Sequence, residues 1–132
     1  MPLVASCHCG ATEIELPGPP AEAKTCNCTY CHRTGAVWGY YRPEDVRVVS
    51  AAHDAVYAPR GMTEHHFCAK CGGNTHGSSP DWASMYNNDG SLKDGMTGGM
   101  PSARIFGVNL RMAIDLDLAT IDITAVDGRN NW

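Results

Sequence analysis

The chain has 132 residues and a formal net charge of -4, and 43% of its residues are hydrophobic. This length and composition predict a single globular domain over residues 1–132 with a modest core. The acidic balance and the absence of a polybasic tract argue against nucleic-acid partners and against a charged membrane surface. No apolar run approaches the roughly 20 residues of a membrane span, so we expect no membrane-spanning segment.

Short strands are predicted along most of the chain, because apolar and β-branched runs alternate with turns rich in glycine and proline. Residues 12–16 show the pattern best, since Thr12, Ile14 and Leu16 alternate with two glutamates. The sequence shows no long amphipathic helix, and the expected fold class is therefore mainly β. Further strands are expected at residues 36–41, 46–49, 53–58, 63–67, 74–77, 104–112 and 121–124.

Two segments depart from the strand pattern. Thr29 is expected to cap one helical turn over residues 30–33, which Gly35 would end. Residues 78–103 are dominated by Gly, Ser, Asn, Asp and Met, and they predict a long irregular loop. A loop of this length in a small domain is usually functional or disordered.

The seven cysteines are the main chemical signal of the sequence. The N-terminus has no basic region followed by a long apolar stretch, so a cytoplasmic, reducing location is expected. In that setting, closely spaced cysteines indicate metal binding rather than disulfides. The C-x-C pair and the distant C-x-x-C pair together supply the four thiolates of a closed structural zinc site. These ligands are Cys7, Cys9, Cys68 and Cys71.

The remaining three cysteines, Cys26, Cys28 and Cys31, fall within six residues. Three protein ligands are typical of an open zinc site that keeps one position for water or substrate. Three thiolates make a zinc ion a weak Lewis acid, poorly suited to forming hydroxide at neutral pH. Such a centre suits a substrate thiolate better, held beside a small electrophile. The sequence therefore predicts zinc-templated thiol chemistry and two zinc ions per chain.

Other interpretations stay open at this point. The three cysteines could form a metal-free redox cluster, or a histidine could close the second site and leave it structural. With a second site closed by histidine, the chain would be a zinc-stabilised protein-binding module without catalysis. The histidines considered for the fourth position are His32, His53, His65, His66 and His76, although the pair His65–His66 is expected to end a strand. The aromatic residues Trp38, Tyr40 and Tyr41 are expected in the core or on a sheet face, or as a wall beside the thiols.

Three motifs resemble the glutathione-dependent formaldehyde-activating enzyme family, which includes relatives of centromere protein V. They are the segments Ser6–Ala11, Cys26–Arg33 and Phe67–Gly72, and they occur in the family's order at similar separations. The resemblance covers residues 3–77 well, and the tail segments 108–111 and 127–129 look like those of short bacterial members.

The resemblance implies a β-tent fold of stacked antiparallel sheets and both zinc sites, the second being catalytic at Cys26, Cys28 and Cys31. It implies a carbon–sulfur lyase that joins formaldehyde to glutathione as S-hydroxymethylglutathione. The partner would be a small thiol such as glutathione, which enters the open zinc position as a thiolate. Four cationic residues are candidates for holding its carboxylates: Lys24, Arg33, Arg42 and Lys70.

Overall fold

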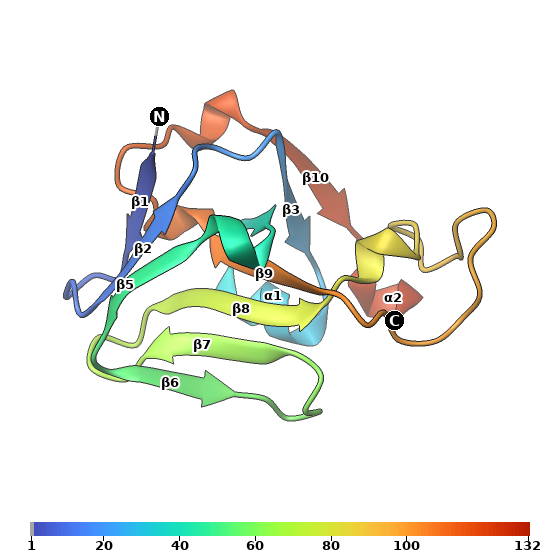
Figure 1. Cartoon of the computed structure of the whole chain (residues 1–132), viewed down its shortest axis with the longest axis horizontal. Coiled ribbons are helices and arrows are strands. Elements are labelled where there is room, and N and C mark those ends of the chain that lie inside the picture. The colour runs from blue at the N-terminus through green and yellow to red at the C-terminus, as the bar shows by residue number, and fades with distance from the viewer. Residues whose placement is uncertain (1) are drawn as a thin grey trace.

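The computed structural model describes residues 2–132, and it confirms the predicted mainly β class. Two sheets account for all ten strands of the described residues (Figure 1). The three-stranded sheet has the order β1-β2-β5, and the seven-stranded sheet has the order β10-β3-β4-β9-β8-β7-β6. The strands are β1 Leu3–Ser6, β2 Thr12–Leu16, β3 Glu22–Cys26, β4 Trp38–Tyr41, β5 Arg47–Ala51, β6 Asp54–Tyr57, β7 Glu64–Cys68, β8 Asn74–Pro80, β9 Arg104–Asn109 and β10 Asp122–Val126.

Helical structure is limited to short pieces. The α-helices are α1 Thr29–Thr34 and α2 Gly128–Asn131, and the 3₁₀ turns are Pro43–Asp45, Trp82–Ser84, Leu110–Met112 and Leu118–Thr120. No helix in residues 2–132 is long and apolar enough to cross a membrane.

The main core lies between the two sheets. The alternation predicted for β2 places Thr12, Ile14 and Leu16 in the interior, where each is at most 1% exposed. Tyr41 and Val108 meet the apolar residues of the smaller sheet from the larger one. Burying these side chains supplies most of the folding free energy of such a small domain. A second cluster of Ala23, Val37 and Leu110 packs beneath the 3₁₀ turns near the C-terminus.

Several predicted boundaries were wrong. The strand expected over residues 104–112 ends at Asn109, because the Asn109 side chain accepts a hydrogen bond from the Arg111 N–H and starts a 3₁₀ turn. Strand β8 extends to Pro80, so the irregular loop begins at residue 81 and contains the 3₁₀ turn Trp82–Ser84. The short bridge between Tyr86 and Leu92 gives this loop further order.

The pairing of β10 with β3 departs from the expected antiparallel pattern. The two strands run parallel, with Asp122 opposite Glu22 and Val126 opposite Cys26. All other strand pairs within the described residues are antiparallel. The parallel pair brings the end of the chain to the start of the three-cysteine run, as the neighbouring positions of β3, β10 and α2 in Figure 1 show.

Candidate metal centres

Four cysteines from distant parts of the chain form one group. Cys7 follows β1, Cys9 lies in the turn after it, Cys68 ends β7, and Cys71 lies in the turn before β8. The sulfur–sulfur distances are 3.7 Å for Cys7–Cys9 and 3.6 Å for Cys9–Cys68. A tetrahedron of sulfurs with Zn–S bonds of about 2.3 Å has edges of about 3.8 Å. The spacing therefore fits a zinc ion, and it is too long for a disulfide.

The surroundings favour the thiolate at two of the four cysteines, Cys7 and Cys71, whereas burial and the neighbouring thiols raise the pKa of Cys9 to about 11. The backbone N–H of Thr12 donates to the Cys7 sulfur over 3.3 Å. Backbone N–H groups of Cys9 and Gly73 lower the pKa of Cys71 to about 6. Metal ligation requires the deprotonated sulfur, so these donors prepare the group for a cation.

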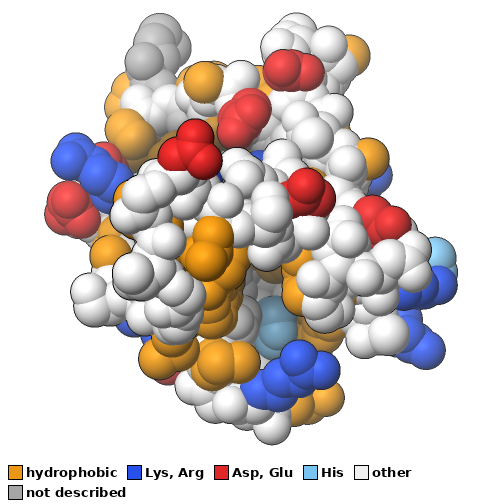
Figure 2. Space-filling model, turned by 90° about the vertical axis from the view of Figure 1, so that its right-hand side faces the viewer, with side chains coloured by type: hydrophobic (Ala, Val, Ile, Leu, Met, Phe, Trp, Pro, Cys, Tyr) orange, Lys and Arg blue, Asp and Glu red, His pale blue; other side chains and the backbone are white. Residues whose placement is uncertain are grey.

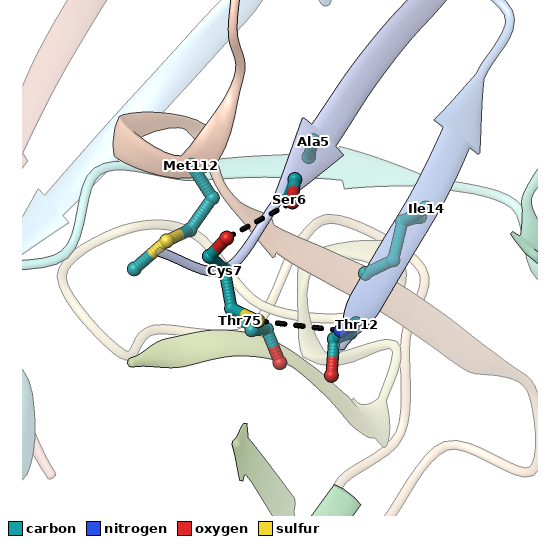
Figure 3. A pocket seen from close by; sticks show the side chains of 7 residues that line it. All are labelled: Ala5, Ser6, Cys7, Thr12, Ile14, Thr75 and Met112. Carbon is teal, nitrogen blue, oxygen red and sulfur yellow. Dashed lines mark hydrogen bonds between the residues drawn. The ribbon is translucent and has the colours of Figure 1, made fainter. Parts of the chain in front are cut away.

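The space behind Cys7 is packed too tightly to admit a water molecule. Figure 3 shows how Ile14, Thr12 and Met112 close it, together with Ala5, Ser6 and Thr75. A substrate therefore has no route to the four-cysteine group from the core side. The group is suited to holding β1 against β7, as a structural site does.

The three remaining cysteines form a second group at the junction of β3 and α1. Cys26 is the last residue of β3, and Cys31 lies within α1. Cys28 is the N-cap of α1 because its sulfur accepts the backbone N–H of Cys31 at 3.4 Å. The predicted cap at Thr29 was wrong, although Gly35 does end the helix in the left-handed conformation. The local fold of α1 thus turns all three thiols toward one point.

Each sulfur of this three-cysteine group accepts at least one hydrogen bond. The backbone N–H of Cys28 donates to Cys26, and the indole Nε1–H of Trp38 donates to Cys31, both over 3.4 Å. Burial raises the pKa of Cys31 to about 12, and the Trp38 donor only partly offsets this effect. Three ionised sulfurs at this separation repel one another, so holding them together requires a cation. The residues present therefore fit a metal ion.

No histidine among the described residues joins the three-cysteine group. The predicted strand end at His65–His66 was also wrong, since both residues lie inside β7. The His65 ring stacks on Tyr30 at 3.8 Å between centroids, on the side of the sheet where α1 packs. Among the described residues, the three-cysteine group thus has no fourth protein side chain that could serve as a ligand.

His66 and His76 belong to a third group, with Asp54, on neighbouring strands. Asp54 lies 2.7 Å from Nδ1 of His66, and the His66 and His76 rings stack with centroids 4.2 Å apart and planes 19° apart. Because the rings are stacked face to face, their in-plane lone pairs do not converge on one ion. Burial lowers the pKa of His76 to about 4 and keeps that ring neutral. His76 is buried and the other two residues are half-buried, so the group packs β6, β7 and β8 together.

The aromatic residues divide between the two faces of the large sheet. Trp38 is buried and bonds to Cys31, so it forms a wall beside the thiols. Tyr40 lies two residues along the same strand and is 42% exposed as a residue, but burial of its hydroxyl and the nearby thiols raise its pKa above the usual value. Tyr41 points to the opposite face, where its hydroxyl donates to the carbonyl of Gly18. Gly107 lies opposite Tyr40 and leaves space beneath the two aromatic rings.

An open pocket of about 260 Å³ lies beside Cys26. Its polar lining comes from Thr25, Asn27, His32 and Asp127, and its apolar lining from Ala125 and Val126. Figure 2 shows a hollow on one face of the molecule, bordered by hydrophobic side chains, with a histidine at its base and a cationic side chain at its edge.

Three of the four candidate cations have partners in the structure. Lys24 donates to Asn88 at 2.8 Å, Arg33 donates to the Thr29 carbonyl at 2.8 Å, and Arg42 forms an ion pair with Asp45. Lys70 is exposed. Arg33 lies in the last turn of α1 and is exposed, and no carboxylate of the described residues forms an ion pair with it.

Comparisons with known proteins agree with the resemblance. The family model of the glutathione-dependent formaldehyde-activating enzyme matches residues 2–108. A crystal structure of a Rhodobacter sphaeroides protein, a structural genomics target, superposes with a TM-score of 0.64. That protein is 28% identical, and the match covers 94% of this chain and 100% of the other. The curated proteins contain no match. The chain belongs to the glutathione-dependent formaldehyde-activating enzyme family.

Proposed function

We propose that the chain is a zinc-dependent carbon–sulfur lyase that acts on a small thiol, with glutathione and formaldehyde as the substrate pair. The observation that carries the proposal is the three-cysteine group, in which Cys26, Cys28 and Cys31 converge without a fourth protein ligand among the described residues. All three cysteines are partly exposed, so a substrate can reach them. Membership of the family supports the same substrates at a coarser level.

The chain's own residues would prepare the thiol site in three ways. Zinc bound by the three sulfurs would supply a fourth position at which a substrate thiol is held as the thiolate. The N–H groups of Cys28, Cys31 and Trp38 hold the three sulfurs in place and favour their ionised form. The rings of Trp38 and Tyr40 would shield one side of the site from water.

In the reaction the thiol loses one proton and the aldehyde oxygen gains one. The sulfur attacks the aldehyde carbon and forms one C–S bond, and the carbonyl electron pair moves to oxygen. That oxygen takes up one proton, equal to the one that the thiol has lost. We infer that the Tyr40 hydroxyl, which is protonated at neutral pH and lies near the thiols, donates this proton.

Metal analysis tests the two-site part of the proposal. The parent protein is expected to contain two zinc ions per chain, and Cys28→Ser one, with glutathione binding lost together with the second ion. Serine is a favoured N-cap, so this variant keeps the start of α1. A parent with one zinc ion and freely alkylated Cys26, Cys28 and Cys31 would contradict the proposal.

Exchange spectroscopy tests the substrate pair. Magnetisation transfer between formaldehyde hydrate and S-hydroxymethylglutathione is measured with the parent, with Cys28→Ser and without protein. The parent should accelerate the exchange, and Cys28→Ser should not. An exchange rate that the parent leaves unchanged would remove formaldehyde and glutathione as substrates.

A further inference from the structure

The C-terminal turn lies against the three-cysteine group. Strand β10 pairs in parallel with β3, so Val126 lies opposite Cys26, and the chain then turns into α2. The family model ends at residue 108, so this turn lies outside the matched residues.

Asn27, which separates two of the thiols in the sequence, fastens the turn. Its side-chain Nδ2–H donates to the Asp127 carboxylate at 2.9 Å, and its Oδ1 accepts the backbone N–H of Arg129 at 3.0 Å. Its backbone N–H donates to the carbonyl of Val126 at 3.2 Å. Asp127 also caps α2 by accepting from the Asn130 backbone N–H and side chain. The three-cysteine run and the chain end are thus held together by three hydrogen bonds, all made by Asn27.

Gly128 occupies the point of closest approach. A Cβ atom at this position would lie 2.5 Å from the Cys26 sulfur and 3.0 Å from the ring of Trp132. A contact of 2.5 Å is far inside van der Waals distance, so any side chain would displace the sulfur. Burial raises the pKa of Cys26, and the nearby backbone N–H of Gly128 partly offsets this effect.

We propose that the C-terminal turn is the outer wall of the thiol site, and that Gly128 is the positioning residue that fixes the Cys26 sulfur as a ligand. This inference rests on the proposed metal at the three-cysteine group. Position 128 requires glycine because the Cys26 sulfur leaves no room for a side chain there. The turn then acts on the metal through Cys26, because its close approach limits where this ligand sulfur can lie.

The variant Gly128→Ala tests the inference by metal release. The holoprotein is mixed with a chromophoric chelator, and the two zinc ions are followed as separate kinetic phases. Substitutions that disturb such supporting contacts typically weaken metal affinity by about 10- to 100-fold. We expect the phase assigned to the second metal to accelerate by a factor in this range, with the other phase unchanged. A cobalt-substituted sample should show altered sulfur-to-cobalt charge-transfer bands for the same site.

Two further glycines provide matched controls. A Cβ on Gly98 meets no atom within 4 Å, so Gly98→Ala should leave both phases as in the parent. A Cβ on Gly39 lies 2.9 Å from Leu110 in the core, so Gly39→Ala should lower thermal stability without accelerating the second phase selectively. Asp127→Ala loosens the same turn without a steric clash, and it should also accelerate the second phase.

The outcomes separate this inference from the proposed function. The inference would be overturned, and the function left standing, if the parent holds two zinc ions and both Gly128→Ala and Asp127→Ala release the second ion at the parental rate. A parent that holds a single zinc ion would overturn both. A selective acceleration in Gly128→Ala and Asp127→Ala, with both controls as expected, supports the role of the turn.

Discussion

The substitution Cys68→Ser tests whether the four-cysteine group stabilises the fold. Cys68 is fully buried, and its sulfur lies 3.6 Å from that of Cys9, 59 residues earlier in the chain. A cross-link that closes a loop of this length removes about 4 kcal/mol of chain entropy from the unfolded state at 25 °C. A domain of this size has a total stability of roughly 5–15 kcal/mol, so the variant should be marginally stable.

Urea denaturation followed by tryptophan fluorescence measures this effect. With a urea dependence of about 2 kcal/mol per M, the loss corresponds to a midpoint lower by about 2 M. Cys31→Ser serves as the control, because it removes a ligand of the other group. The measurement is repeated after a strong chelator has removed the metal. If parent and Cys68→Ser differ equally with and without metal, the serine itself is the cause and the cross-link argument is refuted.

Three further substitutions probe other parts of the structure. Trp38→Phe removes the indole donor to Cys31 and should weaken binding of the second metal about 10-fold in a chelator competition, whereas Trp82→Phe on the exposed loop should not. Replacing Asn109 with Ala leaves the Val37 N–H and the Asn74 carbonyl without partners, and it should cost about 3 kcal/mol by urea denaturation. The pKa of His76 is lowered in the folded state, so the unfolded state binds a proton first and stability falls as the pH drops from about 6.5 toward 4. His76→Phe should remove up to about 1.4 kcal/mol per pH unit of that slope, and equal slopes in parent and variant would contradict the assignment.

The local patterns predicted most of the strands and the fold class. The alternation in β2 determines which of its residues are buried, since side chains of a strand point to opposite faces in turn. The resemblance to the family is confirmed by the match over residues 2–108. The structure brings the seven cysteines into the two groups that their spacing suggested, while their roles as zinc ligands stay a prediction.

The missed features depend on contacts between distant residues. The cap of α1 was assigned to Thr29 because hydroxyl side chains are the usual caps, but here a thiol accepts the hydrogen bond. The donor role of Trp38 depends on the direction of one indole ring, which no local pattern encodes. The contact of Gly128 with Cys26 requires β10 to pair with β3 across about 100 residues, and no local pattern encodes this pairing.

The parallel pairing of β3 with β10 also sets an order of events during synthesis. The four cysteines of the first group are all made once residue 71 has been added, whereas the partner strand of β3 is complete only at residue 126. Translation at about 5–20 residues per second makes this interval roughly 3 to 11 s. Throughout that time Cys26, Cys28 and Cys31 lack the wall that later covers them. The newborn chain therefore passes through a stage in which one cysteine group is complete and the other is still uncovered.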